Sequence, residues 1–471
     1  MTQQRRFLYS ALFFTLAVAL AGAVLAIRPD RAIRVGTGVV SHTLCSGVFV
    51  SGLDPNQLFA EALEPNPGLN MLSKRLRYEV DRTRREVVAT WAGGFTSRAV
   101  YREGRGCMLV YPSDEKGVAA GPVTSSDKLP PTPAQAKANT AGLLEVEPKN
   151  GQLEAALERA FAETARPPHR WVKAIVILHN GKLVAERYAP GYEADTPIYG
   201  YSLAKSVVNA MLGILVRQGK LSVGQLAPVA EWQDPRDARH AITIDELLRM
   251  TSGLALDESD SGFDPVSRML FLEPDMAAYA ERASLEASPG SRWKYTSGNT
   301  LILSRIIRDA VGGRAEDVIE FARRELFDPL GISTATIEFD ATGTPVGSQG
   351  MLLSARDWAR FGMLFMNDGM VDGERILPAG WVGYSTSPTL NSGYGAGFWT
   401  NRGTNEDARW RVRSGMPADS FYGSGSLGQR IVIAPSAGLV IVRMGLTHSP
   451  DFDMGSLVRL VREAVAAFVG K

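Results

Sequence analysis

The sequence predicts an α+β fold in which one antiparallel sheet takes its strands from distant parts of the chain. Two apolar, β-branched runs at about 171–188 are separated by Asn180-Gly181, a dipeptide typical of a tight hairpin turn. A second hairpin pattern occupies residues 429–445, close to the end of the chain. The segments between them are largely compatible with helices separated by glycine and proline turns. Strands at both ends of a unit with a helical middle predict a sheet flanked by helices.

The composition indicates a globular chain without a strongly charged partner. Of the 471 residues, 45% are hydrophobic and 21% are charged, which is typical of folded domains. The formal net charge is +1, so the sequence gives no reason to expect a nucleic acid as partner. No glycine-rich phosphate loop and no cluster of metal ligands stands out, and we therefore expect neither a cofactor nor a metal.

The first 27 residues form a segment of their own. Residues 7–27 carry no charge and are numerous enough to cross a bilayer as a helix. Two interpretations remain open: an uncleaved signal anchor, which the length favours, and a signal peptide that is cleaved near the small residues at 21–26. Either interpretation places the rest of the chain in the periplasm of a bacterial-type cell, attached to the inner membrane or secreted.

Residues 28–111 are predicted to form a small, mainly β accessory module, because short apolar or alternating runs lie between glycines there. Both cysteines of the chain, Cys45 and Cys107, belong to this module. In an oxidising compartment they are expected to pair, whereas two buried free thiols are the alternative for a cytosolic protein. A linker rich in proline, alanine and serine, residues 112–150, leads to one large domain over residues 151–471.

A serine followed three residues later by a lysine can be a nucleophile and its base. The chain contains four such pairs: Ser113/Lys116, Ser125/Lys128, Ser202/Lys205 and Ser291/Lys294. The first two lie in the polar linker and the last follows a Pro-Gly turn, where a lysine stays solvated and protonated. Ser202 and Lys205 instead open a helix, predicted over 203–218, that is apolar nearly all round and therefore buried.

Burial could make Lys205 a neutral base that activates Ser202 as a nucleophile. A lysine in apolar surroundings loses solvation, its pKa falls toward neutrality, and it can then accept the serine proton. The alternative is a serine N-cap with a lysine that extends to solvent. Tyr295 favours the chemical interpretation, because a Ser-Lys mechanism needs a second proton carrier, and the nearby cation is expected to depress the pKa of the tyrosine. A glycine-rich stretch at 421–428 could supply a backbone N–H donor to an oxyanion hole.

Five segments of the chain occur together in an order that is typical of a known superfamily. They are Ser202-Leu-Ala-Lys205, ELLRMTSGL at 246–254, PGSRWKYTSGNT at 289–300, GSQGMLLSARDWARFGMLFMNDG at 347–369 and GYGAGFW at 393–399. With them the chain resembles the class C β-lactamase-related serine hydrolases, which include penicillin-binding proteins, family VIII carboxylesterases and 6-aminohexanoate-dimer hydrolase. The resemblance covers about residues 151–471. It implies a β-lactamase/transpeptidase-like fold, in which a helical lobe accompanies the antiparallel sheet.

The resemblance also implies roles for the matching residues. Ser202 would be the acylated nucleophile and Lys205 its proton acceptor. Tyr295 would relay protons to the leaving group and later from water, and Ser297 would contact the substrate or Lys205. The backbone N–H groups of Ser202 and Ser426 would form the oxyanion hole.

The third motif of the superfamily departs from the usual pattern at Gly423. The motif is commonly Lys-Thr-Gly or His-x-Gly, whereas this chain has Gly423-Ser424-Gly425, followed by Ser426. In penicillin-recognising relatives the cation at this place attracts the substrate carboxylate, which glycine cannot do. The sequence therefore favours an ester, amide or peptide-like small molecule as substrate over β-lactam hydrolysis or D-Ala-D-Ala carboxypeptidase activity. A non-catalytic binding or sensor protein related to penicillin-binding proteins is the alternative from another class, and the intact Ser202, Lys205 and Tyr295 argue against it.

Overall fold

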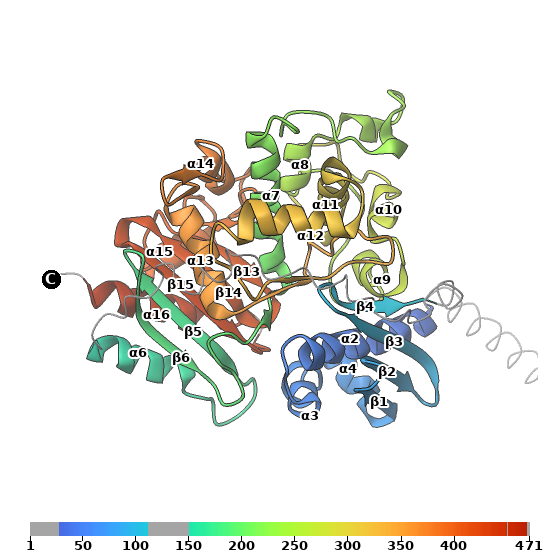
Figure 1. Cartoon of the computed structure of the whole chain (residues 1–471), viewed down its shortest axis with the longest axis horizontal. Helices are drawn as coiled ribbons and strands as arrows, with labels where there is room; N and C mark the ends of the chain where they lie inside the picture. The colour runs from blue at the N-terminus through green and yellow to red at the C-terminus, as the bar shows by residue number, and fades with distance from the viewer. Residues whose placement is uncertain (1–27, 112–149, 450, 469–471) are drawn as a thin grey trace, which may run out of the picture.

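A six-stranded antiparallel sheet with the strand order β12-β13-β14-β15-β5-β6 lies at the centre of the large domain (Figure 1). The computed structural model describes residues 28–111, 150–449 and 451–468. The strands are β5 (Val172–His179), β6 (Lys182–Tyr188), β12 (Trp399–Thr400), β13 (Phe421–Gly425), β14 (Gln429–Ala434) and β15 (Leu439–Gly445). Because β15 pairs with β5, strands from the two ends of the domain meet inside one sheet, which confirms the prediction. Both predicted hairpins are present, and Asn180 and Gly181 form the first turn with φ of 48° and 79°.

Helices cover both faces of this sheet. On one face α6 (Gly151–Phe161) packs with α16 (Met454–Ala466), and on the other α13 (Ala355–Met366) shares a hydrophobic core with α7 (Ala204–Arg217). The further helices are α8 (Ile244–Leu248), α9 (Pro265–Leu272), α10 (Met276–Glu281), α11 (Ser297–Val311), α12 (Ala315–Ala322), α14 (Trp381–Thr386) and α15 (Glu406–Arg413). A small sheet joins β7 (Ile198–Tyr199), which directly precedes the Ser202 turn and α7, to the later strands β9 (Met351–Leu353) and β8 (Thr336–Ile337). This is the predicted α+β architecture.

The N-terminal module, residues 28–111, corrects the prediction of a mainly β unit. Its largest element is α2 (Pro29–Phe49), a helix of 21 residues, which packs on a sheet with the order β1-β2-β3-β4. The remaining elements are α3 (Pro55–Leu58), α4 (Pro67–Leu72), β1 (Leu76–Asp81), β2 (Glu86–Trp91), β3 (Gly94–Arg102) and β4 (Gly106–Val110).

Residues 39–49, which belong to the module predicted to be mainly β, form the second half of α2. Val40, Leu44 and Val48 recur at a spacing of four and are all buried, which is a helical pattern. The glycines of this segment suggested turns, but Gly47 serves close packing. A Cβ atom there would lie 2.0 Å from Cδ2 of Leu58, so any larger residue would require the Leu58 side chain to move.

The disulfide predicted between Cys45 and Cys107 is present. It joins α2 to β4 across 62 residues of sequence, and the two Cα atoms are 6.0 Å apart. Both cysteines are fully buried. A structural disulfide in a chain of this kind fits an oxidising compartment.

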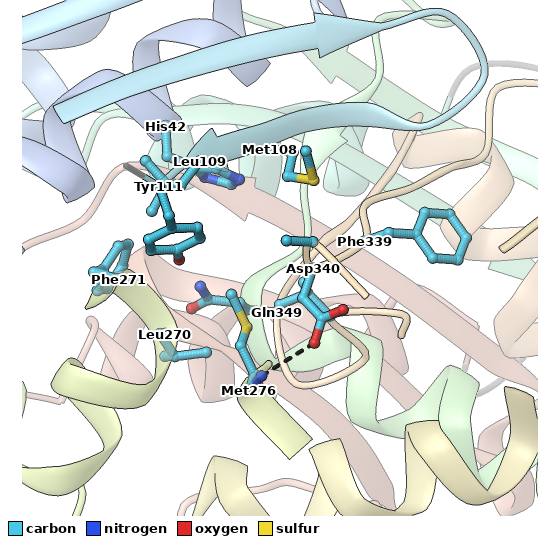
Figure 2. Close-up of a pocket in the computed structure, with 12 residues that line it drawn as sticks. His42, Met108, Leu109, Tyr111, Leu270, Phe271, Met276, Phe339, Asp340 and Gln349 are labelled. Carbon is cyan, nitrogen blue, oxygen red and sulfur yellow. Dashed lines mark hydrogen bonds between the residues drawn. The ribbon is translucent and has the colours of Figure 1, made fainter. Parts of the chain in front are cut away.

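The module packs directly against the large domain. Figure 2 shows His42 and Tyr111 of the module facing Phe271 of α9, with Gln349 below them. The free space enclosed at this contact is only about 10 Å³, so side chains fill it almost completely. Two parts that sequence analysis treats as separate therefore share one packed interface.

The buried carboxylate of Glu338 contacts three residues of the module across this interface. Glu338 of the large domain is fully buried and accepts hydrogen bonds from Ser46 Oγ at 2.6 Å and from the backbone N–H of Cys107 at 3.0 Å. His42 Nε2 lies 3.3 Å from the second carboxylate oxygen. Burial opposes a charge on His42, but the carboxylate of Glu338 outweighs it and raises the pKa of His42.

Two predicted segments fall outside the described residues. These are residues 7–27, predicted to be an anchor or signal peptide, and the linker predicted over 112–150, except for its last residue. Within the described ranges, no helix combines the length and the apolar character that a membrane crossing requires.

Candidate active site

Ser202 and Lys205 lie at the junction between β7 and α7. Ser202 belongs to a short 3₁₀ helix, Tyr201–Leu203, and Lys205 to the first turn of α7. Lys205 Nζ donates a hydrogen bond to Ser202 Oγ at 3.0 Å. A separation of three residues across a helix start places both side chains on the same side, so the local sequence alone produces this contact.

Lys205 is buried among groups that orient its amine. It is 3% exposed, and Nζ also donates to Ser297 Oγ at 3.1 Å and to the backbone carbonyl of Ser348 at 3.0 Å. Burial lowers the pKa of Lys205 to about 8, against the opposing effect of the Glu258 and Asp260 carboxylates. A fraction of the lysine is therefore neutral near neutral pH and able to accept a proton.

Tyr295 completes the group that the sequence predicts. Its ring centroid lies 4.8 Å from Lys205 Nζ, and Ser202 is among the groups that act on the pKa of its hydroxyl. The expected depression of its pKa is wrong. Burial, with Glu258 adding to it, raises the pKa of Tyr295 well above its ordinary value. Tyr295 therefore keeps its proton at neutral pH.

Two aromatic side chains hold the ring of Tyr295 in place. The ring of Tyr394 meets it edge to face, with centroids 5.9 Å apart, and Trp399 lies nearly parallel at 6.1 Å. Both belong to the segment that contains GYGAGFW. Asn209 of α7 fastens this segment by donating to the carbonyl of Ala396 at 2.8 Å.

An acidic loop that sequence reasoning missed borders the site. The loop has four carboxylates within eight residues, Asp257, Glu258, Asp260 and Asp264. Glu258 accepts hydrogen bonds from the backbone N–H and the hydroxyl of Ser297, and it thereby reaches the residue that contacts Lys205. The density of acidic residues was a visible signal, but nothing in the local pattern connected it with Lys205.

The third motif lies against the turn that carries the predicted nucleophile. A Cβ atom on Gly425 would be 2.3 Å from the carbonyl oxygen of Gly200, and one on Gly423 would be 3.0 Å from Cδ2 of Leu203. The glycines thus allow β13 to pack on the Ser202 turn, and they bring Ser426, the next residue after the strand, to the same edge.

A cation that sequence reasoning also missed lies beside this motif. Arg430 of β14 pairs with Ser424 of β13, is 3% exposed, and donates from Nη1 to the carbonyl of Gly425 at 2.8 Å. Burial lowers the pKa of Arg430 to about 10. Its guanidinium binds the backbone at the end of β13. Gly423 still occupies the position at which the resembling penicillin-recognising enzymes have a cation.

The other Ser-x-x-Lys pairs do not form a comparable site in the described residues. Ser291 is exposed, and Lys294 forms ion pairs with Glu286, at 2.7 Å, and with Asp257. Although burial opposes it, hydrogen bonds to these carboxylates raise the pKa of Lys294, so this lysine stays protonated. The pairs at 113/116 and 125/128 lie outside the described residues.

Comparisons with known proteins agree with the fold. Residues 161–466 match the family model described as Beta-lactamase. The chain is 25% identical over 314 residues to the 6-aminohexanoate-dimer hydrolase of Paenarthrobacter ureafaciens, an alignment that covers 63% of this chain and 76% of that protein.

Solved structures show the same fold. A penicillin-binding protein homologue from Caulobacter crescentus superposes with a TM-score of 0.53 at 19% identity, over 68% of this chain and 98% of the other. A family VIII carboxylesterase superposes with a TM-score of 0.50 at 14% identity and equal coverage, 68% and 98%. Since the family model matches well over half of the residues, the chain belongs to the β-lactamase family and is a serine hydrolase with the β-lactamase/transpeptidase-like fold.

Proposed function

We propose that this serine hydrolase cleaves ester or amide bonds of small molecules through an acyl-enzyme on Ser202, in the manner of carboxylesterases or 6-aminohexanoate-dimer hydrolases. The observation that carries the proposal is the 3.0 Å contact between Ser202 Oγ and the amine of Lys205. Burial lowers the pKa of this lysine to about 8, so part of it is unprotonated near neutral pH. Such a pair activates a serine hydroxyl for attack on a carbonyl carbon.

We assign the steps of the reaction to Ser202, Lys205, Tyr295 and Ser426. As Ser202 Oγ bonds to the substrate carbonyl carbon, its proton moves to neutral Lys205, and the N–H groups of Ser202 and Ser426 bind the oxyanion. The bond to the leaving group then breaks. Tyr295 gives its proton to the departing oxygen or nitrogen and receives one from Lys205, which a tyrosine with a raised pKa can do only in such a relay. Water reverses the sequence: its proton passes through Tyr295 to Lys205, its oxygen bonds to the acyl carbon, and Ser202 leaves with a proton.

Gly423 supports esters and amides over β-lactams. Substrates of penicillin-recognising enzymes carry a carboxylate that needs a cation at this place, and the nearby Arg430 guanidinium is buried and bonded to backbone carbonyls. β-Lactam or D-Ala-D-Ala hydrolysis is therefore the weaker candidate.

We also propose a periplasmic location at the inner membrane. The disulfide and the uncharged run at 7–27 support it.

Mass spectrometry of the intact protein tests the proposal. Incubation with a fluorophosphonate should add one phosphonyl group, and p-nitrophenyl butyrate should be turned over at least about a hundredfold faster than nitrocefin, measured as kcat/KM. A protein without an adduct and without ester turnover would contradict the proposal and favour the binding or sensor role. Faster nitrocefin turnover would instead favour a β-lactamase. The mass of protein purified from membranes also shows whether residues 1–26 are retained, as an anchor requires.

The pH dependence of hydrolysis should report on Lys205. Since the lysine must be neutral to act as a base, kcat/KM should rise with pH through about 8. The carboxylate of Glu258 raises the pKa of Lys205, so Glu258→Gln should move this limb to lower pH, by up to about one unit, while the amide oxygen still accepts from Ser297. The exposed Glu320 of α12 offers a control, since Glu320→Gln should leave the profile in place. A limb that moves upward in Glu258→Gln, or not at all, would exclude Lys205 as the titrating base.

A further inference from the structure

A large cavity lies between the N-terminal module and the large domain. Its volume is about 660 Å³, within the range of small-molecule sites. The module contributes α2 and α4, and the large domain contributes the loop 260–263, the end of α9, the segment 426–427, and His448, Ser449 and Phe452. The lining is mainly apolar and includes Ile33, Val39, Leu63, Leu72, Leu270 and Phe271.

This cavity borders the active site through residues that adjoin the reacting groups. Tyr201, which precedes Ser202, and Ser426, which would supply an oxyanion N–H, both line it, as does Asp260, whose charge acts on Lys205. A second, more polar cavity of about 570 Å³ is lined by Tyr295, Glu258 and Lys294, and it adjoins the first at Ser261 and Phe263. Because Tyr295 would protonate the leaving group, the polar cavity is on the leaving-group side and the apolar cavity is on the oxyanion side.

The wall formed by α2 and α4 lies outside the part of the chain that matches the family model. The family match begins at residue 161, whereas α2 and α4 precede residue 73. The wall is also held firmly. Gly38 lets α2 approach α9 so closely that a Cβ atom there would lie 3.3 Å from Cβ of Phe271. Two further contacts hold α2 in place: Ser46 of α2 donates a hydrogen bond to Glu338, and Cys45 of α2 forms the disulfide with Cys107. Both lie near the tightly packed contact that Figure 2 shows.

Two apolar side chains of the lining are open to solvent. Met71 is 87% exposed and Phe263 is 57% exposed, and they belong to the small set of large apolar side chains that the described residues expose. Met71 belongs to the module and Phe263 to the acidic loop, so the two come from the two parts that form the cavity. Large apolar groups gathered at a cavity mark a surface that an apolar ligand covers.

We propose that this cavity binds the acyl chain of the substrate, and that the N-terminal module makes the enzyme selective for esters or amides of medium-length fatty acids. The proposal rests on the Ser202 mechanism proposed above. It places the apolar acyl part beside Ser426 and the polar leaving group beside Tyr295. Each methylene group that enters the cavity should contribute about 0.8 kcal/mol, or roughly fourfold in kcat/KM, until the chain reaches the far wall.

A series of p-nitrophenyl esters below their aggregation limits tests the proposal. From acetate to octanoate, kcat/KM should rise at least about thirtyfold, since only part of each methylene's transfer free energy is realised. Ile33→Glu places a charge in the wall of the cavity, and Val39→Phe narrows it with an apolar group. Each should reduce the octanoate to acetate ratio at least about tenfold. Because the two changes are chemically different and both positions are only partly buried, a folding defect in one leaves the other informative.

Leu226→Glu is the matched control. Leu226 is 46% exposed and lies outside the cavity lining, so this variant should keep the wild-type ratio. Wild-type turnover that does not depend on chain length, or variants that keep the ratio, would overturn the acyl-chain assignment while leaving the Ser202 mechanism in place. Failure to turn over any ester of the series would instead count against the mechanism.

Discussion

Replacement of Ser202 by alanine is expected to remove fluorophosphonate labelling completely and to lower kcat/KM for p-nitrophenyl butyrate by about 10⁴-fold or more. The hydroxyl of Ser202 is the group to which Lys205 Nζ donates at 3.0 Å, and it is among the groups that act on the pKa of Tyr295. Without it, both proton carriers remain but no nucleophile can form the acyl-enzyme. Labelling followed by intact mass, and hydrolysis followed at 405 nm (about the absorbance maximum of p-nitrophenolate), measure the two losses separately.

Ser291→Ala is the control that the chain itself provides. Ser291 begins the only other Ser-x-x-Lys pair among the described residues; it is exposed, and its hydroxyl donates to the carbonyl of Ser288 at 2.6 Å. This variant should be labelled and active like the wild type. Equal labelling of Ser202→Ala and wild type would place the nucleophile elsewhere, and loss of labelling in Ser291→Ala alone would assign it to the second pair.

The elements with strong local signals could be predicted from the sequence. The hairpin turn at Asn180-Gly181 and the buried helix after Ser202 depend on neighbouring residues, and both are present as predicted. The contact between Ser202 and Lys205 follows from a spacing of three residues. The disulfide followed from the presence of two cysteines in one chain.

What the sequence could not show depends on contacts between distant segments. Glu258 reaches Ser297 across 39 residues, and Glu338 reaches Ser46 across 292, so no local pattern predicts either. The predicted direction of the shift in the Tyr295 pKa was wrong for a related reason. The nearby lysine was visible in the motif, but the burial of the ring and the Glu258 carboxylate, which outweigh it, come from the fold.

The glycines of α2 show how one residue type can mislead. Between short apolar runs they resemble turn signals, yet they lie inside a helix that packs closely on Leu58 and Phe271. The error matters for function, because α2 is the element that joins the module to the large domain and lines the apolar cavity. A module regarded as accessory is therefore part of the structure around the site.

Loss of the Glu338 carboxylate should have the largest effect on stability. Glu338→Ala is expected to lower the free energy of unfolding by about 3–5 kcal/mol, the typical cost of breaking a buried ionic contact. The variant leaves the Ser46 hydroxyl and the Cys107 N–H without their acceptor and His42 without its counter-charge. Denaturant unfolding followed by circular dichroism measures the difference at constant pH.

The pH dependence of this loss separates the charge of His42 from simple packing. The pKa of His42 is raised in the fold, so its contact with Glu338 stabilises fully below the unfolded value of about 6.5 and is lost as pH rises through the raised value. In Glu338→Ala the burial of His42, which disfavours the imidazolium, is opposed only by the hydrogen bond to the Cys107 backbone, so the loss of stability should be larger at pH 6 than at pH 9. Glu320→Ala, which removes an exposed ion pair with Arg324 at 3.5 Å, should cost less than about 1 kcal/mol at both pH values. A loss in Glu338→Ala that is the same at both pH values would mean that His42 carries no charge in the folded protein and that Glu338 stabilises the interface through its hydrogen bonds to Ser46 and Cys107.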